Sequence, residues 1–192
     1  MQSARENLLA TARDVVVAGD WERMPLAEIA GRAKVSRQTL YKEFGSKDGL
    51  AEALSAHETQ IFMIELATVI EAYPGDPVAG TRAAVEYTLR TGADDPLLKS
   101  IMSSARGPSD LLPLFTTRAE PLFAAARQLL TSYLTAHWSH LSTRDVALVA
   151  DSVIRLTVSH LVLPLGPIDR TADDLATLVQ RLLPLESLQE RS

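Results

Sequence analysis

Apolar residues recur along almost the whole chain at the three- and four-residue spacing of amphipathic helices. The first such stretch runs from Ala4 to Ala18 and ends before Gly19, a residue type common just past helix ends. A shorter stretch follows, with apolar residues at positions i, i+3, i+4 and i+7: Leu26, Ile29, Ala30 and Ala33. The pattern predicts two helices, with Trp21 packed in the connection between them.

A second short helix is predicted after a tight corner at Lys34–Val35. Ser36 is a good N-cap for it, because its hydroxyl can accept a hydrogen bond from a free amide of the following turn. The helix is expected from Arg37 to about Phe44, with Leu40 on the inner side and a polar, partly basic outer side. Two short helices, a tight turn and the start of a third are the layout of a helix-turn-helix, so residues 24–50 predict DNA recognition.

The rest of the chain also reads as helical. A long helix is expected from Lys47 to about Tyr73, stopped by Pro74–Pro77. Its predicted inner face carries Leu50, Leu54, His57, Ile61 and Ile64. Further helices are expected at Val78–Thr91, Pro96–Ser104, Leu111–His137, Thr143–Val162 and Thr171–Leu183, with Pro113 and Pro121 bending or dividing the one from Leu111. Strands have no convincing place, so we expect an all-α protein.

Composition narrows the class further. A chain of 192 residues can hold one small and one medium domain. The absence of cysteine excludes disulfides, cysteine nucleophiles and thiolate metal sites. The N-terminus lacks the apolar region of a signal peptide, and no apolar run approaches the ~20 residues of a membrane span. We therefore expect a cytoplasmic protein without a membrane partner.

The distribution of charge supports one DNA-facing surface. The net charge is −5, which would be unusual for a protein that coats nucleic acid at random. From Gly31 to Lys47, however, five basic residues stand against the single acid Glu43, a net charge of +4. Attraction to phosphate is therefore expected on this segment alone.

The helix-turn-helix segment resembles the DNA-binding domain of the tetracycline-repressor (TetR) family of bacterial one-component regulators. The resemblance covers roughly the first quarter of the chain, and order, spacing and residue types agree together. It rests on Ile29, Ala30, Ala33, Val35, Ser36, Thr39, Leu40, Tyr41, Phe44, Lys47 and Leu50. Beyond Leu54 only the family's usual length and helical texture are recognisable.

Four positions depart from the family's usual pattern. Met24–Pro25 stands where Thr is common, so a usual phosphate-contacting hydroxyl is missing. Lys34 stands where the turn usually has Gly, and it must accept any backbone strain that the turn imposes. Gln38 replaces a small residue or Pro, and Glu43 replaces a His or a similar residue.

The resemblance implies a domain organisation. It predicts a three-helix helix-turn-helix DNA-binding domain at residues 1–46. A long helix would join this domain to a larger helical ligand-binding and dimerisation domain at residues 47–192.

Three residues are candidates for contact with the DNA backbone. Lys47, in the first turn of the long helix beside free amides, is placed to hold a phosphate. Tyr41 and Arg37 lie on the flank of the second helix, where a hydroxyl and a guanidinium can reach the backbone. Tyr41 can also be partly core.

Three further residues, on the outer face of the same helix, are candidates for base contact. Gln38, Thr39 and Lys42 are expected at or near base edges, with Gln suited to adenine and Lys to guanine. Ordinary solvent exposure is the alternative for these residues, and about one of the three is expected to have only that role.

Two narrow apolar stripes near the C-terminus suggest self-association. One comprises Val146, Val149, Val153, Leu156 and His160; the other comprises Leu175, Leu178, Leu182 and Leu185. Ser142 with Asp145, and Thr171 with Asp174, are predicted capping boxes at the starts of these helices. The pattern fits packing inside one subunit equally well. The resemblance favours a homodimer built on the last two long helices, whose paired reading helices would match a palindromic operator.

A small, mostly apolar effector is expected in a cavity among the middle helices. Gly80, Ala83 and Ala84 are expected to surround Tyr87, leaving volume beside a single hydrogen-bonding group. The remaining wall is expected from Phe62, Met102, Phe115, Phe123, Leu130 and Leu134. Ordinary core packing is the alternative for each of these residues.

An enzyme finds little support. His137 and His140 could form a surface metal site, but two solvated histidines at a helix end are the favoured interpretation. Asp94–Asp95 fits a helix cap better than a catalytic pair. His57 and His160 lie in apolar stripes and fit hydrogen-bonded core histidines. Without a Gly-rich phosphate loop or a nucleophile elbow, we expect no catalysis and no cofactor.

The leading hypothesis is a repressor that leaves a palindromic operator on double-stranded DNA when a ligand binds. An activator or a ligand-independent repressor could use the same domain. A dimeric metabolite-binding protein without operator recognition is the alternative from another class.

Overall fold

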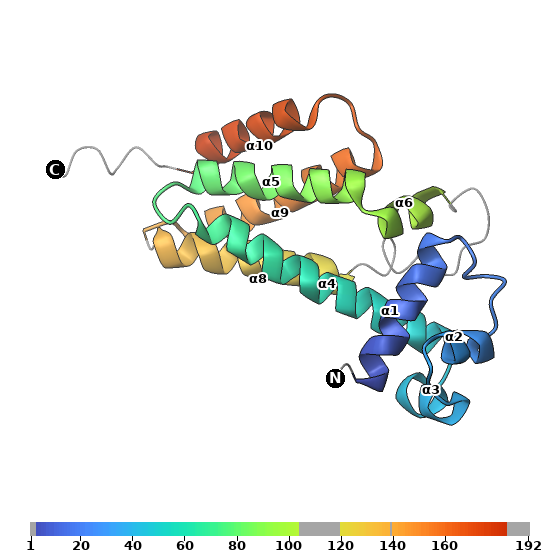
Figure 1. Ribbon diagram of the computed structural model, residues 1–192. Helices are drawn as coiled ribbons and strands as arrows, with labels where there is room; N and C mark the ends of the chain where they lie inside the picture. The colour runs from blue at the N-terminus through green and yellow to red at the C-terminus, as the bar shows by residue number, and fades with distance from the viewer. Residues whose placement is uncertain (1–2, 104–119, 139, 184–192) are drawn as a thin grey trace. The chain divides into compact units, whose positions relative to one another are not determined.

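The computed structural model describes residues 3–103, 120–138 and 140–183, and across these ranges the chain forms helices and no strands (Figure 1). The helices are α1 (Ala4–Val17), α2 (Leu26–Arg32), α3 (Arg37–Phe44), α4 (Lys47–Glu71), α5 (Pro77–Asp94), α6 (Pro96–Ser103), α8 (Glu120–His137), α9 (Thr143–Val162) and α10 (Ile168–Leu182). The all-α prediction is confirmed. Among the described residues no helix is long and apolar enough to cross a membrane.

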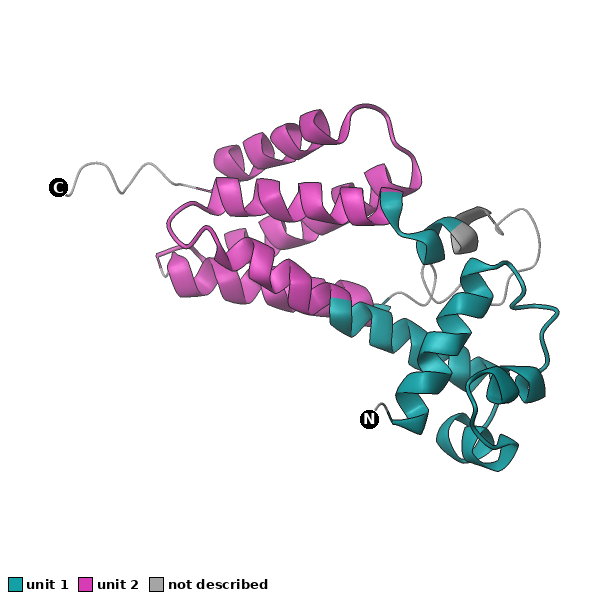
Figure 2. Cartoon of the chain, viewed as in Figure 1, with its two compact units in different colours: residues 1–61, 94–120 teal, residues 62–93, 121–192 magenta. Residues whose placement is uncertain are grey.

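The chain divides into two compact units (Figure 2). Unit 1 comprises residues 1–61 and 94–120, and unit 2 comprises residues 62–93 and 121–192. Unit 1 therefore contains α6 and the first part of α4 as well as the three N-terminal helices, so the division differs from the boundary expected after residue 46. The physical reason is burial, because Leu50 and Leu97 both lie in the core that α1, α2 and α3 form.

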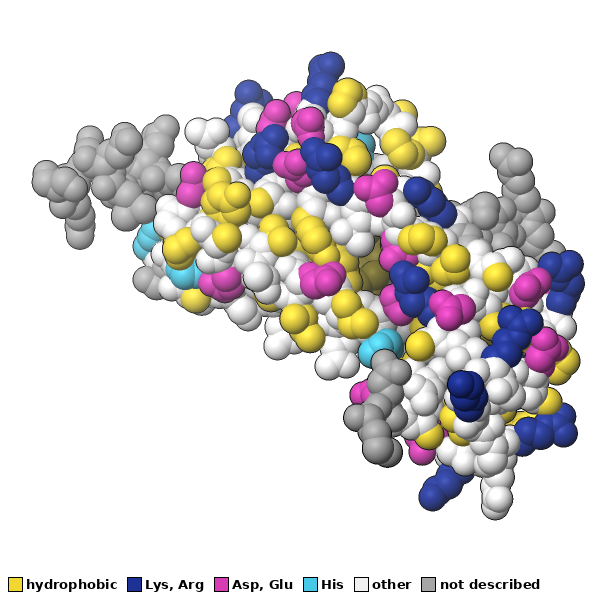
Figure 3. Space-filling model, in the orientation of Figure 1, with side chains coloured by type: hydrophobic (Ala, Val, Ile, Leu, Met, Phe, Trp, Pro, Cys, Tyr) yellow, Lys and Arg dark blue, Asp and Glu magenta, His cyan; other side chains and the backbone are white. Residues whose placement is uncertain are grey.

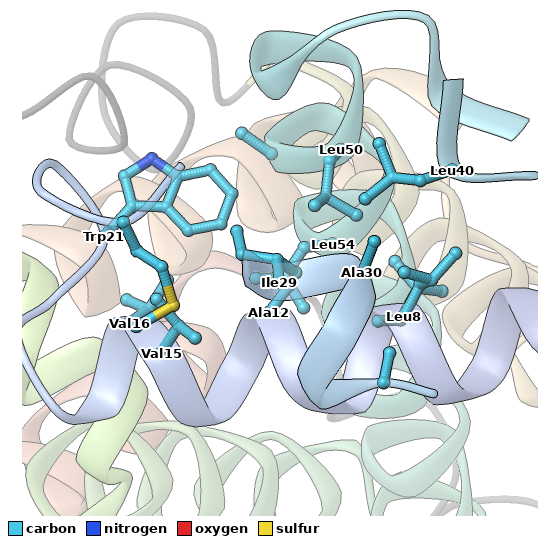
Figure 4. Close-up of a cluster of buried hydrophobic side chains, with 14 of the residues drawn as sticks. Leu8, Ala12, Val15, Val16, Trp21, Ile29, Ala30, Leu40, Leu50 and Leu54 are labelled. Atoms are coloured by element: carbon cyan, nitrogen blue, oxygen red, sulfur yellow. The ribbon is translucent and has the colours of Figure 1, made fainter. Parts of the chain in front are cut away.

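The core of unit 1 is built from the apolar positions that the sequence predicts. α1 buries Leu8, Leu9, Ala12, Val15 and Val16. Figure 4 shows four of them, Leu8, Ala12, Val15 and Val16, in one cluster with Ile29 and Ala30 of α2, Leu40 of α3 and Leu50 of α4. Trp21 is 4% exposed in the same core, as expected for the connection after α1. Every element of the helix-turn-helix thus contributes to one shared core.

Local backbone features fix the corner between α2 and α3. Ser36 is the N-cap of α3, and its Oγ accepts a hydrogen bond from the Thr39 amide at 3.1 Å. Lys34 has φ of 55°, the left-handed region that favours glycine. The strain expected at this departure from the family pattern is therefore present.

The buried face of α4 differs from the predicted one. Leu50 and Leu54 are buried, but Ile61 is 41% exposed and Ile64 is 61% exposed. Leu66 is buried instead, and Ile70 joins the core of unit 2. The 54, 57, 61, 64 spacing assumes that one partner follows a single stripe along the helix. α4 instead contributes Leu50 and Leu54 to the core of unit 1 and Ile70 to the core of unit 2.

The core of unit 2 is organised around Tyr133 of α8. Its hydroxyl donates a hydrogen bond to the carbonyl of Tyr73 at 2.5 Å, and burial raises the pKa of Tyr133 to about 12. Gly80 leaves the space for that hydroxyl, because a Cβ there would collide with Tyr133 Oη. Trp138 is 4% exposed in the same core, with its ring edge-on to Tyr133 at 5.6 Å between centroids.

Two helix starts test the predicted capping boxes. At α9 the Ser142 side chain accepts a hydrogen bond from the Asp145 amide at 3.1 Å, which confirms Ser142 as an N-cap. At α10 the prediction is wrong. The helix begins at Ile168 after Pro167, and Thr171 is buried in the first turns instead of capping them.

The helix predicted from Leu111 is described only from Glu120. Pro121 is the second residue of α8 as described, and the bend or division expected there stays a prediction because the residues before Glu120 lie outside the described ranges. Pro113 lies outside the described residues.

An ion-pair network joins α5 to α10. Glu86 accepts from both Arg82 and Arg90 at 2.7 Å. Arg82 also reaches Asp173 at 2.6 Å, and Arg90 reaches Asp169 at 2.8 Å. The charged side of α5 is therefore partnered by side chains of α10.

Candidate DNA-binding surface

The outer surface of α3 is open to solvent. Residues four apart share a face of a helix, so its accessible surface divides into three pairs. Gln38 and Lys42 form the middle pair, Arg37 and Tyr41 one flank, and Thr39 and Glu43 the other. Within the described residues, the side chains of Arg37, Gln38, Tyr41 and Lys42 are exposed and form no hydrogen bond or ion pair.

Thr39 is less free than the other candidates. It is half-buried, and its Oγ1 lies 2.8 Å from the Ser36 hydroxyl. The Thr39 amide also donates to that hydroxyl. This side chain therefore belongs to the cap of α3 first, and its base contact remains a prediction.

Lys47 has partners inside unit 1 that the sequence did not predict. Its Nζ donates to the carbonyl oxygens of Trp21 at 2.5 Å and Glu22 at 3.3 Å. The same ammonium lies 5.3 Å from the centroid of the Trp21 ring. An ammonium has three N–H donors, so one remains for the predicted phosphate.

The start of α2 lacks a side-chain cap. Pro25 occupies the N-cap position and makes no side-chain hydrogen bond. The hydroxyl expected from the family pattern is therefore absent from this helix end.

Basic side chains are spread over unit 1, as Figure 3 shows in dark blue over the region of α1 to α3 in that view. Arg32 is paired with Glu28 at 3.0 Å. Arg5 of α1 lies 3.7 Å from Glu43 of α3. Sequence reasoning missed Arg5, because no local pattern relates α1 to the end of α3.

The candidate ligand region in unit 2 contains an aromatic pair. Tyr87 stacks on Phe62 at 5.8 Å between ring centroids, and its hydroxyl donates to Glu65 at 2.5 Å. Burial, together with the Glu65 carboxylate, raises the pKa of Tyr87. Both rings are half-buried.

The other expected lining residues have different surroundings. Leu130 and Leu134 are buried in the core of unit 2, and Phe123 is half-buried. Gly80 faces Tyr133, so the expectation that it lines Tyr87 was wrong. The Met102 side chain and Phe115 lie outside the described residues.

The stripes expected at a dimer interface are partly used inside the subunit. The residues packed in the subunit's own core are Val146, Val149, Val153 and Leu175, each at most 5% exposed. Leu156 and Leu182 are both 38% exposed, while His160 and Leu178 are half-buried. Leu185 lies outside the described residues. Any dimer contact on these helices must therefore use the accessible side chains.

The aspartates and histidines considered for catalysis lie in a helix cap, an ion pair and the protein interior. Asp95 Oδ1 accepts hydrogen bonds from the amides of Leu97 at 2.6 Å and Leu98 at 3.2 Å, so it caps α6 as expected. His137 Nε2 lies 3.3 Å from Glu71. His160 Nδ1 is buried with no partner in the described part of the chain, unlike the hydrogen-bonded core histidine expected there. The described residues contain no His/Asp/Glu cluster suited to a metal.

Two family models match the chain. Residues 8–54 match that of the bacterial regulatory proteins of the tetR family. Residues 76–181, more than half of the chain, match that of the bacterial tetracyclin repressor C-terminal domain. The first match covers α2 and α3, and the second spans α5 to nearly the end of α10.

Similar proteins are regulators of transcription. The HTH-type transcriptional regulator AlkX of Mycobacterium tuberculosis (strain ATCC 25618 / H37Rv) is 29% identical over 175 residues, covering 91% of this chain and 82% of AlkX. The crystal structure of the TetR family repressor AlkX from Dietzia sp. strain DQ12-45-1b, implicated in biodegradation of n-alkanes, has a TM-score of 0.71 and 28% identity over 94% of this chain and 95% of that one.

A more distant structure shares the fold. FadR from Bacillus subtilis, solved in complex with stearoyl-CoA, has a TM-score of 0.61 at 13% identity, covering 90% of this chain and 96% of that one. Family models and relatives agree with the helix-turn-helix geometry of α2 and α3. The chain belongs to the TetR family of bacterial transcriptional regulators.

Proposed function

We propose that this protein is a homodimeric repressor that binds a palindromic operator through α3 and leaves it when a small, mostly apolar molecule binds in unit 2. The observation that carries the DNA-binding part is the outer face of α3, where Gln38 and Lys42 are exposed and unpaired within the described residues. Polar side chains that no internal partner holds can exchange water for base edges at little cost.

Gln38 and Lys42 are the proposed base readers. The amide of Gln suits adenine and the ammonium of Lys suits guanine. Replacing either residue with Ala should cost ~1–3 kcal/mol of binding free energy on the operator and little on random duplex DNA. Gel shifts with DNA from upstream of the protein's own coding region would measure both, with the exposed Gln180→Ala of α10 as control. Equal losses on both DNAs would reduce the two residues to backbone contacts.

Lys47, Arg37 and Tyr41 are the proposed phosphate contacts. For Lys47 the contact would use the N–H that the two carbonyls of the α1–α2 connection leave free. Lys47→Ala should reduce the slope of log K against log salt by ~0.9 per subunit without changing sequence preference. Because the variant also loses the carbonyl bonds, its unfolding midpoint must be measured in parallel.

The proposed dimer uses the accessible sides of α9 and α10. Leu148 is 53% exposed and Leu156 is 38% exposed, although both are large and apolar. The loop between the two helices adds Leu163 and Leu165, which are 64% and 77% exposed. Apolar side chains left open in one subunit are the ones that association would cover.

The proposed effector carries an aliphatic chain. The supporting observations are the mostly apolar interior of unit 2 and the resemblance to AlkX of Dietzia, which is implicated in biodegradation of n-alkanes. Native mass spectrometry of the purified protein, followed by gel shifts with long-chain alkanes, fatty acids and acyl-CoA, would identify the class. Tyr87→Ala should weaken its binding, and a multiply charged polar effector would contradict the proposal.

The gel shift also separates the alternatives. An activator would bind the same operator yet raise transcription in a reporter assay. A metabolite-binding protein without operator recognition would show no preference between its own upstream DNA and random duplex.

A further inference from the structure

Arg5 of α1 contacts the end of the reading helix. Its guanidinium lies 4.9 Å from the centroid of the Phe44 ring, and its Nη1 lies 3.7 Å from Glu43 Oε2. The Arg5 side chain remains 50% exposed, and that of Glu43 35% exposed. A cation from another helix is therefore fixed beside α3 without being buried.

The two flanks of α3 differ in charge. A helix in the major groove lies between two phosphate backbones, so both of its flanks approach negative charge. One flank presents Arg37 and Tyr41, which suit phosphate. The other presents Thr39 and Glu43, and Glu43 is the one acidic residue between Gly31 and Lys47. On α3 alone, this second flank would repel the backbone beside it.

Arg5 offsets the negative charge of that flank. We propose that Arg5 is a phosphate-binding residue that serves the second flank of α3, with Glu43 and Phe44 holding its guanidinium in position. A guanidinium carries five N–H donors in a rigid fork, so one edge can face Glu43 while the others remain for a phosphate. The cation–π contact with the Phe44 ring holds the guanidinium beside α3, while half of the Arg5 side chain stays exposed. The proposal rests on the proposed DNA-binding function.

The test measures the salt dependence of DNA binding for Arg5→Gln, Arg5→Lys, Glu43→Gln and the double variant Arg5→Gln/Glu43→Gln. Arg5→Gln should reduce the slope of log K against log salt by ~0.9 per subunit, and weaken binding ~8-fold per contact at 0.1 M salt, on operator and random duplex alike. Arg5→Lys should keep the slope because it keeps the charge. Arg170→Gln, which removes an 81% exposed arginine from α10 of unit 2, is the control for net charge.

The double variant decides between two roles for Arg5. A phosphate contact predicts that Arg5→Gln reduces the slope in the Glu43→Gln background as well. If the double variant binds like Glu43→Gln alone, Arg5 merely neutralises Glu43 and the proposal is overturned. Failure of the DNA-binding proposal looks different, because Gln38→Ala and Lys42→Ala would then also leave operator binding unchanged.

Discussion

At the corner between α2 and α3, Lys34 holds a backbone conformation that costs an L-residue energy, with φ of 55°. Lys34→Gly should stabilise the protein by about 0.5–1 kcal/mol, because glycine adopts this region without a Cβ penalty. The gain is smaller than the full penalty, since glycine also raises the conformational entropy of the unfolded chain. Chemical denaturation would measure the change. Lys34→Ala is the matched control, since it removes the charge and keeps the Cβ, and equal midpoints for both variants would show that the strain is negligible.

The close approach of Gly80 and Tyr133 can be tested by substitution. Gly80→Ala should destabilise unit 2 by about 1–3 kcal/mol, because the new methyl group collides with Tyr133 Oη. Tyr133→Phe removes that oxygen, so the double variant should lose less than the two single variants added together. Additive losses in thermal or urea unfolding would mean that the methyl group meets another obstacle.

These residues show what the sequence can predict at this scale. The cap at Ser36 and the strain at Lys34 depend on neighbours a few positions away, so the spacing of residue types is enough to predict them. The partners of Gly80 and Arg5 come from other helices, and only the packed structure brings them together. For the same reason the expected Tyr87 surroundings included Gly80 wrongly.

The packing of α10 against α5 involves ion pairs as well as the apolar face of α10. Glu86 of α5 accepts from Arg90 and Arg82, and these hydrogen bonds lower the pKa of Glu86. A carboxyl group with a lowered folded-state pKa contributes stability above its unfolded pKa, and that stability is lost as the pH falls through the folded value.

Glu86→Gln should therefore be less stable than the parent protein at pH 7. The difference should shrink as the pH falls below the ordinary Glu86 value of 4.5 and through its lowered pKa. Urea unfolding across this range, at low and high salt, would measure it. Asp174→Asn is the control, since this carboxylate of α10 is 73% exposed and lies 4.0 Å from Arg170. A stability difference between Glu86→Gln and the parent protein that persists unchanged at low pH would show that the variant loses packing and not charge interactions.

Helix starts mark the limit of sequence prediction for elements. α1 and α2 lie where apolar spacing places them, and α3 begins directly after the predicted cap Ser36. The capping pattern at Thr171 and Asp174 is equally regular. The helix nevertheless begins earlier, at Ile168 directly after Pro167, and the Thr171 side chain is buried in the core. Local patterns propose several starts, and tertiary packing selects among them.

The apolar stripes alone do not show which residues pack inside the subunit and which would contact a second subunit. A helix that packs inside its subunit and one that packs across a dimer have the same apolar period. The structure assigns Val153 to the subunit's own core and leaves Leu148 open. The expected fold is confirmed, while the interface stays a prediction with a different set of residues.

Leu148→Asp should give a folded monomer with weaker operator binding, because a carboxylate replaces an accessible leucine in the proposed interface. Light scattering and circular dichroism would measure mass and folding together. Val153→Asp is the contrasting variant, and it should unfold unit 2, since its carboxylate would be buried without a partner. A dimer that survives Leu148→Asp would move the interface away from this side of α9.

The chain has two tryptophans, and each unit buries one of them, Trp21 in unit 1 and Trp138 in unit 2. Intrinsic fluorescence can therefore be separated by unit with a single Trp138→Phe replacement. The remaining indole has the Lys47 ammonium over its face. When a phosphate binds the remaining N–H of Lys47, the field on that indole should change, so the emission of Trp21 should shift as operator DNA is added. Trp21 would then be an optical reporter of DNA binding, at a lysine that serves the fold and the proposed phosphate contact together.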